Sequence, residues 1–177
     1  MCFFPPSYPK EAMQKMTRIA ASTAANRYYL ARMEAAKTNE RLSSREGASE
    51  ETGIDRKRMQ RIEIGTLNPY PEEVMLMADA YHAPELMNFY CTSACPIGQK
   101  IVPKAELREL DRLAVKFLNA LDGIKGTDKA LLSIAADGKL TSDEIPAMEE
   151  LLEAIKAIST VGYELEIFKE KHGRCER

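Results

Sequence analysis

Apolar and polar residues recur along the chain with the three- to four-residue spacing of helices. Few stretches alternate apolar and polar side chains as half-buried strands do. Residues 17–37 are rich in helix-forming Ala, Arg, Met and Glu, and their apolar members Tyr29, Leu30, Met33 and Ala36 recur at helical spacing. We therefore predict an all-α protein, with an N-terminal helical bundle followed by a C-terminal helical bundle or hairpin.

Two short helices separated by a glycine turn are predicted within residues 43–65. Ser44 can cap the start of a first helix that ends at Gly53. Asp55 can cap a second helix over residues 56–64, which Gly65 ends. The two helices are therefore expected to be joined by a tight turn that contains the glycine.

The rest of the chain divides into further segments. Residues 1–16 hold several prolines and are expected to form a flexible N-terminal arm, and residues 17–90 a domain whose fourth helix opens at Pro71. A Cys- and Pro-containing linker is predicted over residues 91–103, then a C-terminal region over 104–177. That region contains amphipathic helices at 104–122, 128–136 and 143–171, the first with the apolar stripe Leu107, Leu110, Leu113, Ala114, Phe117, Leu118 and Leu121. We expect the first and last of these helices to bury their apolar stripes against each other.

Composition narrows the functional classes. The 177 residues carry a net charge of −2, so the overall charge does not indicate a nucleic-acid binder. No apolar run approaches the roughly 18 residues needed to span a bilayer, and the start lacks the features of a signal peptide, so we expect a cytoplasmic protein. With only two histidines and no phosphate-binding loop, nucleophile elbow or His-Glu metal motif, we expect no enzyme.

The second helix of the pair has one apolar and one cationic side. Met59 and Ile62 lie three residues apart and are expected to face a core. The opposite side, which we call the outer face, then holds Arg56, Lys57, Gln60 and Arg61, with Arg58 at its flank. Arginine can bind guanine through two hydrogen bonds and glutamine can bind adenine in the same way. A short helix with such a face fits the DNA major groove, although residues 26–83 together hold nine Lys/Arg and ten Asp/Glu.

The same segment resembles the Cro/repressor-type (XRE-like) helix-turn-helix family over about residues 27–83. The matching positions are Ser44, Arg45, Ser49, Gly53, Ile54, Met59, Ile62, Glu63, Gly65, Asn68 and Pro69. The resemblance implies that the residue at Arg45 binds phosphate, that Arg56, Lys57 and Arg61 face bases or phosphates, and that Glu63 is structural. The chain departs from the family pattern at Arg45, Ser49 and Thr52, where glutamine, alanine and leucine are usual.

These observations together predict a sequence-specific transcription regulator that binds double-stranded DNA. Arg56, Lys57, Gln60 and Arg61 are expected to contact bases, and Ser44, Arg45 and Arg58 the DNA backbone. One short helix covers few base pairs, so we expect a homodimer, with the C-terminal region as the place of contact.

Two alternative functions remain open at this stage. Cys91 and Cys95 would face the same way on a helix and could supply half of a zinc or iron–sulfur site, which would make the protein a metal- or redox-responsive regulator. A pair of reduced, partly buried thiols at a helix end is the favoured explanation. The near-neutral charge of residues 26–83 also allows a protein-interaction adaptor, such as an antitoxin-like regulator that works through its C-terminal helices.

Overall fold

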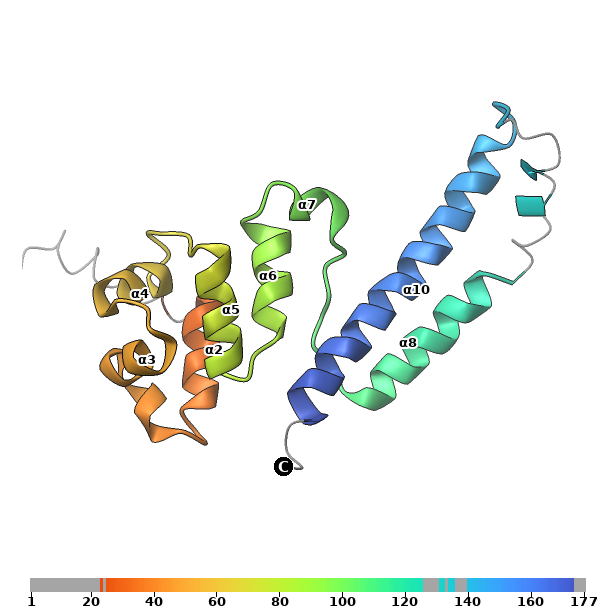
Figure 1. Cartoon of the computed structure of the whole chain (residues 1–177). Coiled ribbons are helices and arrows are strands. Elements are labelled where there is room, and N and C mark those ends of the chain that lie inside the picture. The colour runs from red at the N-terminus through yellow and green to blue at the C-terminus, as the bar shows by residue number, and fades with distance from the viewer. Residues whose placement is uncertain (1–22, 24, 126–130, 133, 136–139, 174–177) are drawn as a thin grey trace, which may run out of the picture. The chain divides into compact units, whose positions relative to one another are not determined.

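The computed structural model describes residues 23, 25–125, 131–132, 134–135 and 140–173. The predicted arm over residues 1–16 therefore lies outside the described residues. The chain divides into two compact units, residues 1–90 and 91–177. Every regular element in the described part is a helix and none is a strand, which confirms the all-α prediction (Figure 1). No helix among the residues described combines the length and apolar character needed to cross a membrane.

The N-terminal unit is a succession of short helices. In chain order they are α2 (Arg27–Ala35), the 3-10 turn η1 (Glu40–Ser43), α3 (Arg45–Thr52), α4 (Arg56–Glu63), α5 (Pro71–Ala80) and α6 (Glu85–Ser93), the last of which runs past the boundary between the units. The predicted first helix over 17–37 lies partly outside the described residues, and its described part ends at Ala35 rather than Lys37.

The local signals around α3 and α4 act as the sequence predicts. The Ser44 hydroxyl accepts a hydrogen bond from the Gly47 amide at 3.0 Å, and the Asp55 carboxylate accepts one from the Arg58 amide at 3.0 Å. Each bond satisfies an amide that the helix itself leaves without a partner. Gly53 ends α3 with a φ of 72°, a conformation that costs glycine least. The turn between the helices is therefore only three residues long.

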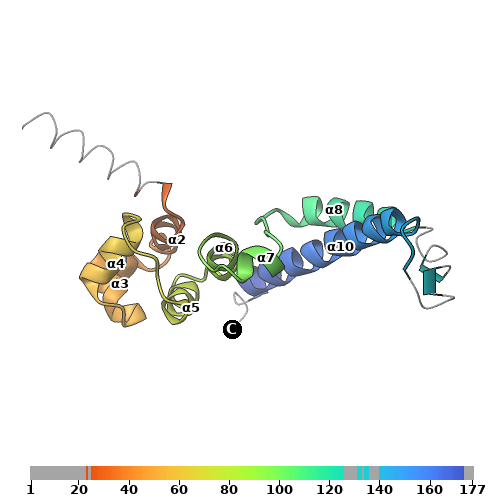
Figure 2. The ribbon, with the colours of Figure 1, turned by 90° about the horizontal axis from the view of Figure 1, so that it is seen from above.

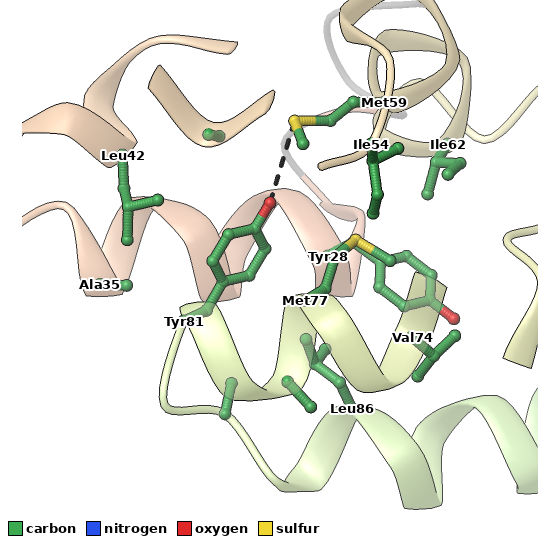
Figure 3. Close-up of a cluster of buried hydrophobic side chains, with 13 residues drawn as sticks. Tyr28, Ala35, Leu42, Ile54, Met59, Ile62, Val74, Met77, Tyr81 and Leu86 are labelled. Carbon is green, nitrogen blue, oxygen red and sulfur yellow. Dashed lines mark hydrogen bonds between the residues drawn. The ribbon is translucent and has the colours of Figure 1, made fainter. Parts of the chain in front are cut away.

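The core of the N-terminal unit draws on every helix described in it (Figure 3). Its buried members are Tyr28, Ala35, Leu42, Ala48, Ile54, Met59, Ile62, Val74, Met77, Ala78, Tyr81, Ala83 and Leu86. In Figure 3 the hydroxyl of Tyr81 points to the sulfur of Met59, at 3.9 Å. Burial raises the pKa of this phenol, with a further contribution from the nearby Glu63 carboxylate.

The buried side of α2 is not the one marked by its helically spaced apolar residues. Leu30 and Met33 are exposed, and α2 buries Tyr28, Arg32 and Ala35. The charged side chain of Arg32 lies in the middle of the buried side. It can be buried there because buried acceptors bind its guanidinium, as described below. A count of hydrophobic residues alone misses such a position.

The C-terminal unit is built around two helices, α8 (Leu110–Gly123) and α10 (Ile145–His172), preceded by the single-turn α7 (Gly98–Ile101). Helices α8 and α10 lie side by side and run in opposite directions in both views (Figures 1 and 2). Helix α8 begins six residues later than predicted. Of the predicted helix 128–136, residues 131, 132, 134 and 135 are helical, and the remainder lies outside the described residues.

The expectation that these two helices bury their apolar stripes against each other is wrong. In the predicted stripe of α8, Leu113 is buried, but Leu110, Phe117, Leu118 and Leu121 are all exposed. Helix α10 buries Leu151, Val161, Glu164 and Ile167, whereas its apolar residues Ile145, Leu152 and Ile155 are exposed. Two helices in contact cover only one side of each other, so the wide apolar stripe of α8 extends beyond the contact.

Candidate nucleic-acid interface

Helix α4 is held firmly on its inner side. Met59 and Ile62 are fully buried, as predicted. In the second half of α3, the Ser49 hydroxyl donates to the Ile54 carbonyl at 2.6 Å. The buried Thr52 hydroxyl donates to the Ala48 carbonyl at 2.7 Å and accepts from the Ile54 amide at 3.2 Å. The family that this segment resembles usually has alanine and leucine at these two positions. Ser49 and Thr52 are accommodated here because each hydroxyl has a hydrogen-bond partner.

The outer face of α4 points to solvent. Arg56, Lys57, Gln60 and Arg61 are all exposed. Arg56 is paired with Glu46 on α3. Within the part of the chain that the structure describes, the side chains of Lys57, Gln60 and Arg61 make no hydrogen bond or ion pair, so their donors are available to a ligand. The structure thus brings all four predicted base-contacting residues onto one accessible face.

A buried network of charges fixes the orientation of α4. The Glu63 carboxylate, at the end of α4, is fully buried and binds two arginines. Arg32 on α2 reaches it through Nε at 2.6 Å and Nη2 at 3.2 Å, and Arg45 on α3 through Nε at 2.6 Å. Arg32 also donates to the Leu42 carbonyl at 2.7 Å. A buried carboxylate with this many charge-assisted bonds ties α4 to the two helices beside it.

The Glu63 network also gives Arg45 a structural contact. The Nε of its guanidinium donates to Glu63, and the side chain is about one-third exposed (32%). Ser44 is exposed, and because its oxygen accepts from Gly47, its hydroxyl proton remains to be donated. The predicted backbone contacts of these two residues remain predictions, and both residues lie at the amide-rich start of α3, where anions are favoured.

Arg58, the third predicted backbone-contacting residue, belongs to a second cluster. Its guanidinium binds Glu73 through Nε and, at 2.8 Å, through Nη2, and it stacks on the Tyr70 ring 4.2 Å from the centroid. Glu73 also accepts from the Tyr70 amide at 2.7 Å, which satisfies the amide of the residue just before α5. The hydrogen bond from Arg58 lowers the pKa of Glu73. Arg58 thus anchors α5 to α4 from the flank of the outer face.

Sequence reasoning assigned no role to Arg32 and did not predict the partners of Arg58. The charges that pair lie 31 residues apart in one case and 15 in the other. A signal was available for the first, because Arg32 falls four residues after Tyr28 and three before Ala35, on the buried side of α2. An arginine in the middle of an apolar stripe indicates a buried acidic partner.

The two cysteines do not lie on one helical face. Cys91 is in the last turn of α6, which ends at Ser93, and Cys95 lies beyond that end, where its sulfur accepts a hydrogen bond from the Gly98 amide at 3.4 Å. Both are free thiols of intermediate burial. No group of three or more His, Cys, Asp or Glu side chains suited to a metal occurs among the residues searched, which are those described. A zinc or iron–sulfur site here therefore remains a prediction without further ligands to support it.

Comparison with known proteins leaves the chain without an established family. No protein-family model, no curated protein and no solved structure matches it. The case for a function therefore rests on the residues and geometry of the chain itself.

Proposed function

We propose that this protein is a sequence-specific DNA-binding transcription regulator, in which α3 and α4 form a helix-turn-helix and α4 enters the major groove. The observation that carries the proposal is the outer face of α4. Two cations and an amide side chain, Lys57, Arg61 and Gln60, project without partners among the described residues from a short helix whose opposite side is locked into a core. A rigid support matters because base recognition requires donors held in fixed positions.

The proposed contacts divide into two kinds. Arg61 and Gln60 have the geometry to bond base edges, guanine and adenine respectively, while Lys57 supplies a point charge one turn from Arg61. Arg56 also contacts a base or phosphate after its ion pair with Glu46 breaks. Breaking this pair costs little free energy, because both side chains are exposed to solvent. Ser44 and the exposed edge of Arg45 contact a phosphate at the start of α3.

Selection of duplex DNA from a random pool by the purified protein tests the proposal directly. We expect the wild type to enrich a motif with two-fold symmetry, and the triple variant Arg56→Ala, Lys57→Ala, Arg61→Ala to enrich none. If the wild type enriches nothing even at low salt, the proposal is wrong. A protein-interaction adaptor that works through the exposed apolar residues of the C-terminal unit then becomes the leading hypothesis.

A single substitution refines the test. Arg61→Ala is expected to weaken binding to the selected site by roughly 1–3 kcal/mol and to relax the choice of base at one position. The matched control is Lys37→Ala, which also removes one exposed cation but lies beyond the end of α2, paired with Glu34. Equal losses for the two variants in a binding titration at moderate salt would mean that Arg61 acts only through general charge.

A further inference from the structure

Helix α8 exposes a continuous row of apolar side chains. Leu110, Phe117 and Leu121 are 53%, 36% and 37% exposed, Ala114 between them is also exposed, and Leu118 beside the row is 63% exposed. Exposed apolar residues are common singly, but a row along one helix marks a contact surface. Helix α10 leaves this row partly uncovered, because it packs on the neighbouring side of α8, where Leu113 is fully buried.

We infer that the row of Leu110, Ala114, Phe117 and Leu121 is a dimerisation surface that binds the same row of a second copy, with the two α8 helices antiparallel. The spacing of these residues is four, three and four, which reads the same in both directions. A two-fold axis between positions 115 and 116 therefore places Leu110 against Leu121 of the second copy, twice, and Ala114 against Phe117, also twice. A two-fold contact requires such self-complementarity, and it sets the smallest side chain of the row opposite the largest.

The size of the surface fits a second copy of the chain. At their exposed fractions, the large side chains of the row together with the adjacent Leu118 present roughly 400 Å² of apolar area, about half of the roughly 800 Å² that each partner buries in a standard-size interface. Apolar side chains make up somewhat more than half of such an interface, and polar rim residues make up the rest. Two α8–α10 hairpins joined in this way form a four-helix arrangement, in which each hairpin covers the apolar row that the other leaves exposed.

The dimer would supply what the outer face of α4 lacks. One recognition helix contacts a single half-site, and a two-fold dimer presents two. This use of the dimer rests on the proposed function, whereas the pairing of the α8 helices does not depend on DNA.

A pair of charge variants in the full-length chain tests both the surface and the direction of pairing. Leu110→Glu and Leu121→Lys each place a charge at the helix end whose dipole favours it, so neither is expected to destabilise α8 itself. Each variant alone would bury two unpaired charges in its homodimer and is expected to weaken dimerisation by at least about tenfold. When the two variants are mixed, the introduced carboxylate at position 110 of one copy meets the introduced ammonium at position 121 of the other, and a heterodimer is expected to form.

The mass in solution is measured by light scattering, and the composition of the mixed species by native mass spectrometry. Val115→Glu is the control, because Val115 is 59% exposed on α8 but lies outside the row. A dimer for the wild type and the control, monomers for the two variants and a heterodimer for the mixture would establish the interface. A monomeric wild type, equal disruption by the control, or a mixture that stays monomeric would each overturn it. A protein that dimerises as expected but selects no DNA would refute the proposed function alone.

Discussion

The two units of the chain satisfy their side chains in different ways. In the N-terminal unit, short helices of eight to ten residues bury side chains from every element around one core, and the buried charges Arg32 and Glu63 pair with each other. In the C-terminal unit, helices of 14 and 28 residues leave several large apolar side chains exposed, among them Leu118, Leu110 and Leu152. The longer helices are thus the less completely buried ones.

The difference shows that helix length and amphipathicity do not by themselves make a complete core. Five short helices that meet from several directions can enclose a volume, whereas two antiparallel helices share only a line of contact. Among the described residues, the N-terminal unit thus encloses a core, whereas α8 in the C-terminal unit keeps large apolar side chains exposed. This contrast supports the two proposals, DNA binding by the outer face of α4 and association through α8.

The largest effect is expected from breaking the charge network of the N-terminal unit. Glu63→Ala leaves the buried guanidinium of Arg32 without its carboxylate, and we expect a loss of about 3–5 kcal/mol in the free energy of unfolding. Urea unfolding measures the loss. Hydrogen exchange should locate it in α2 to α5, while amides of α8 and α10 keep their protection.

The control for this variant is Glu50→Ala, which removes a carboxylate from an exposed ion pair with Arg41 and should cause no measurable change. A loss for Glu63→Ala as small as that of the control would show that solvent or another acceptor compensates Arg32. It would also weaken the contrast between a unit whose buried charges are paired and one whose apolar row is exposed.

The features predicted correctly from the sequence are those set by neighbouring residues. Ser44, Gly53 and Asp55 mark the ends of α3 and α4 because a cap acts on amides only a few positions away. The accessible face of α4 followed from the position of Met59 and Ile62 in the same turn of helix. Such local rules need no knowledge of the rest of the fold.

The features that the sequence did not reveal depend on residues far apart. Arg32 is buried only because Glu63 meets it from another helix, and Glu73 engages Arg58 from the start of α5. The apolar stripe of α8 could be recognised in the sequence, but the prediction that α10 buries it was wrong. The spacing of apolar residues does not indicate how much of a stripe one neighbouring helix covers. Long-range pairing and unfilled surface are properties of the assembled fold.

An intermediate effect is expected from protein concentration. If α8 pairs with a second copy, each tenfold rise in concentration stabilises the associated hairpin by about 1.4 kcal/mol per mole of dimer. Hydrogen exchange at two concentrations should therefore show rising protection in α8 and unchanged protection in α3 and α4. Equal changes in both units, or none in either, would contradict the division of tasks.

The smallest effect concerns the acid stability of the N-terminal unit. Arg58 lowers the pKa of Glu73 from its ordinary value of 4.5, so the folded state favours the carboxylate. The contribution of this carboxylate to the free energy of unfolding is fully present above that value and is lost as the pH falls through the lowered pKa.

Glu73→Gln should therefore be less stable than the wild type at pH 7, by about 1 kcal/mol or less, the size of a helix-cap interaction. The two proteins should converge as the pH falls below 4.5 through the lowered pKa of Glu73, as urea unfolding at each pH would show. A difference that does not depend on pH would mean that Glu73 acts through packing alone, because a glutamine keeps the shape of the side chain but cannot carry its charge.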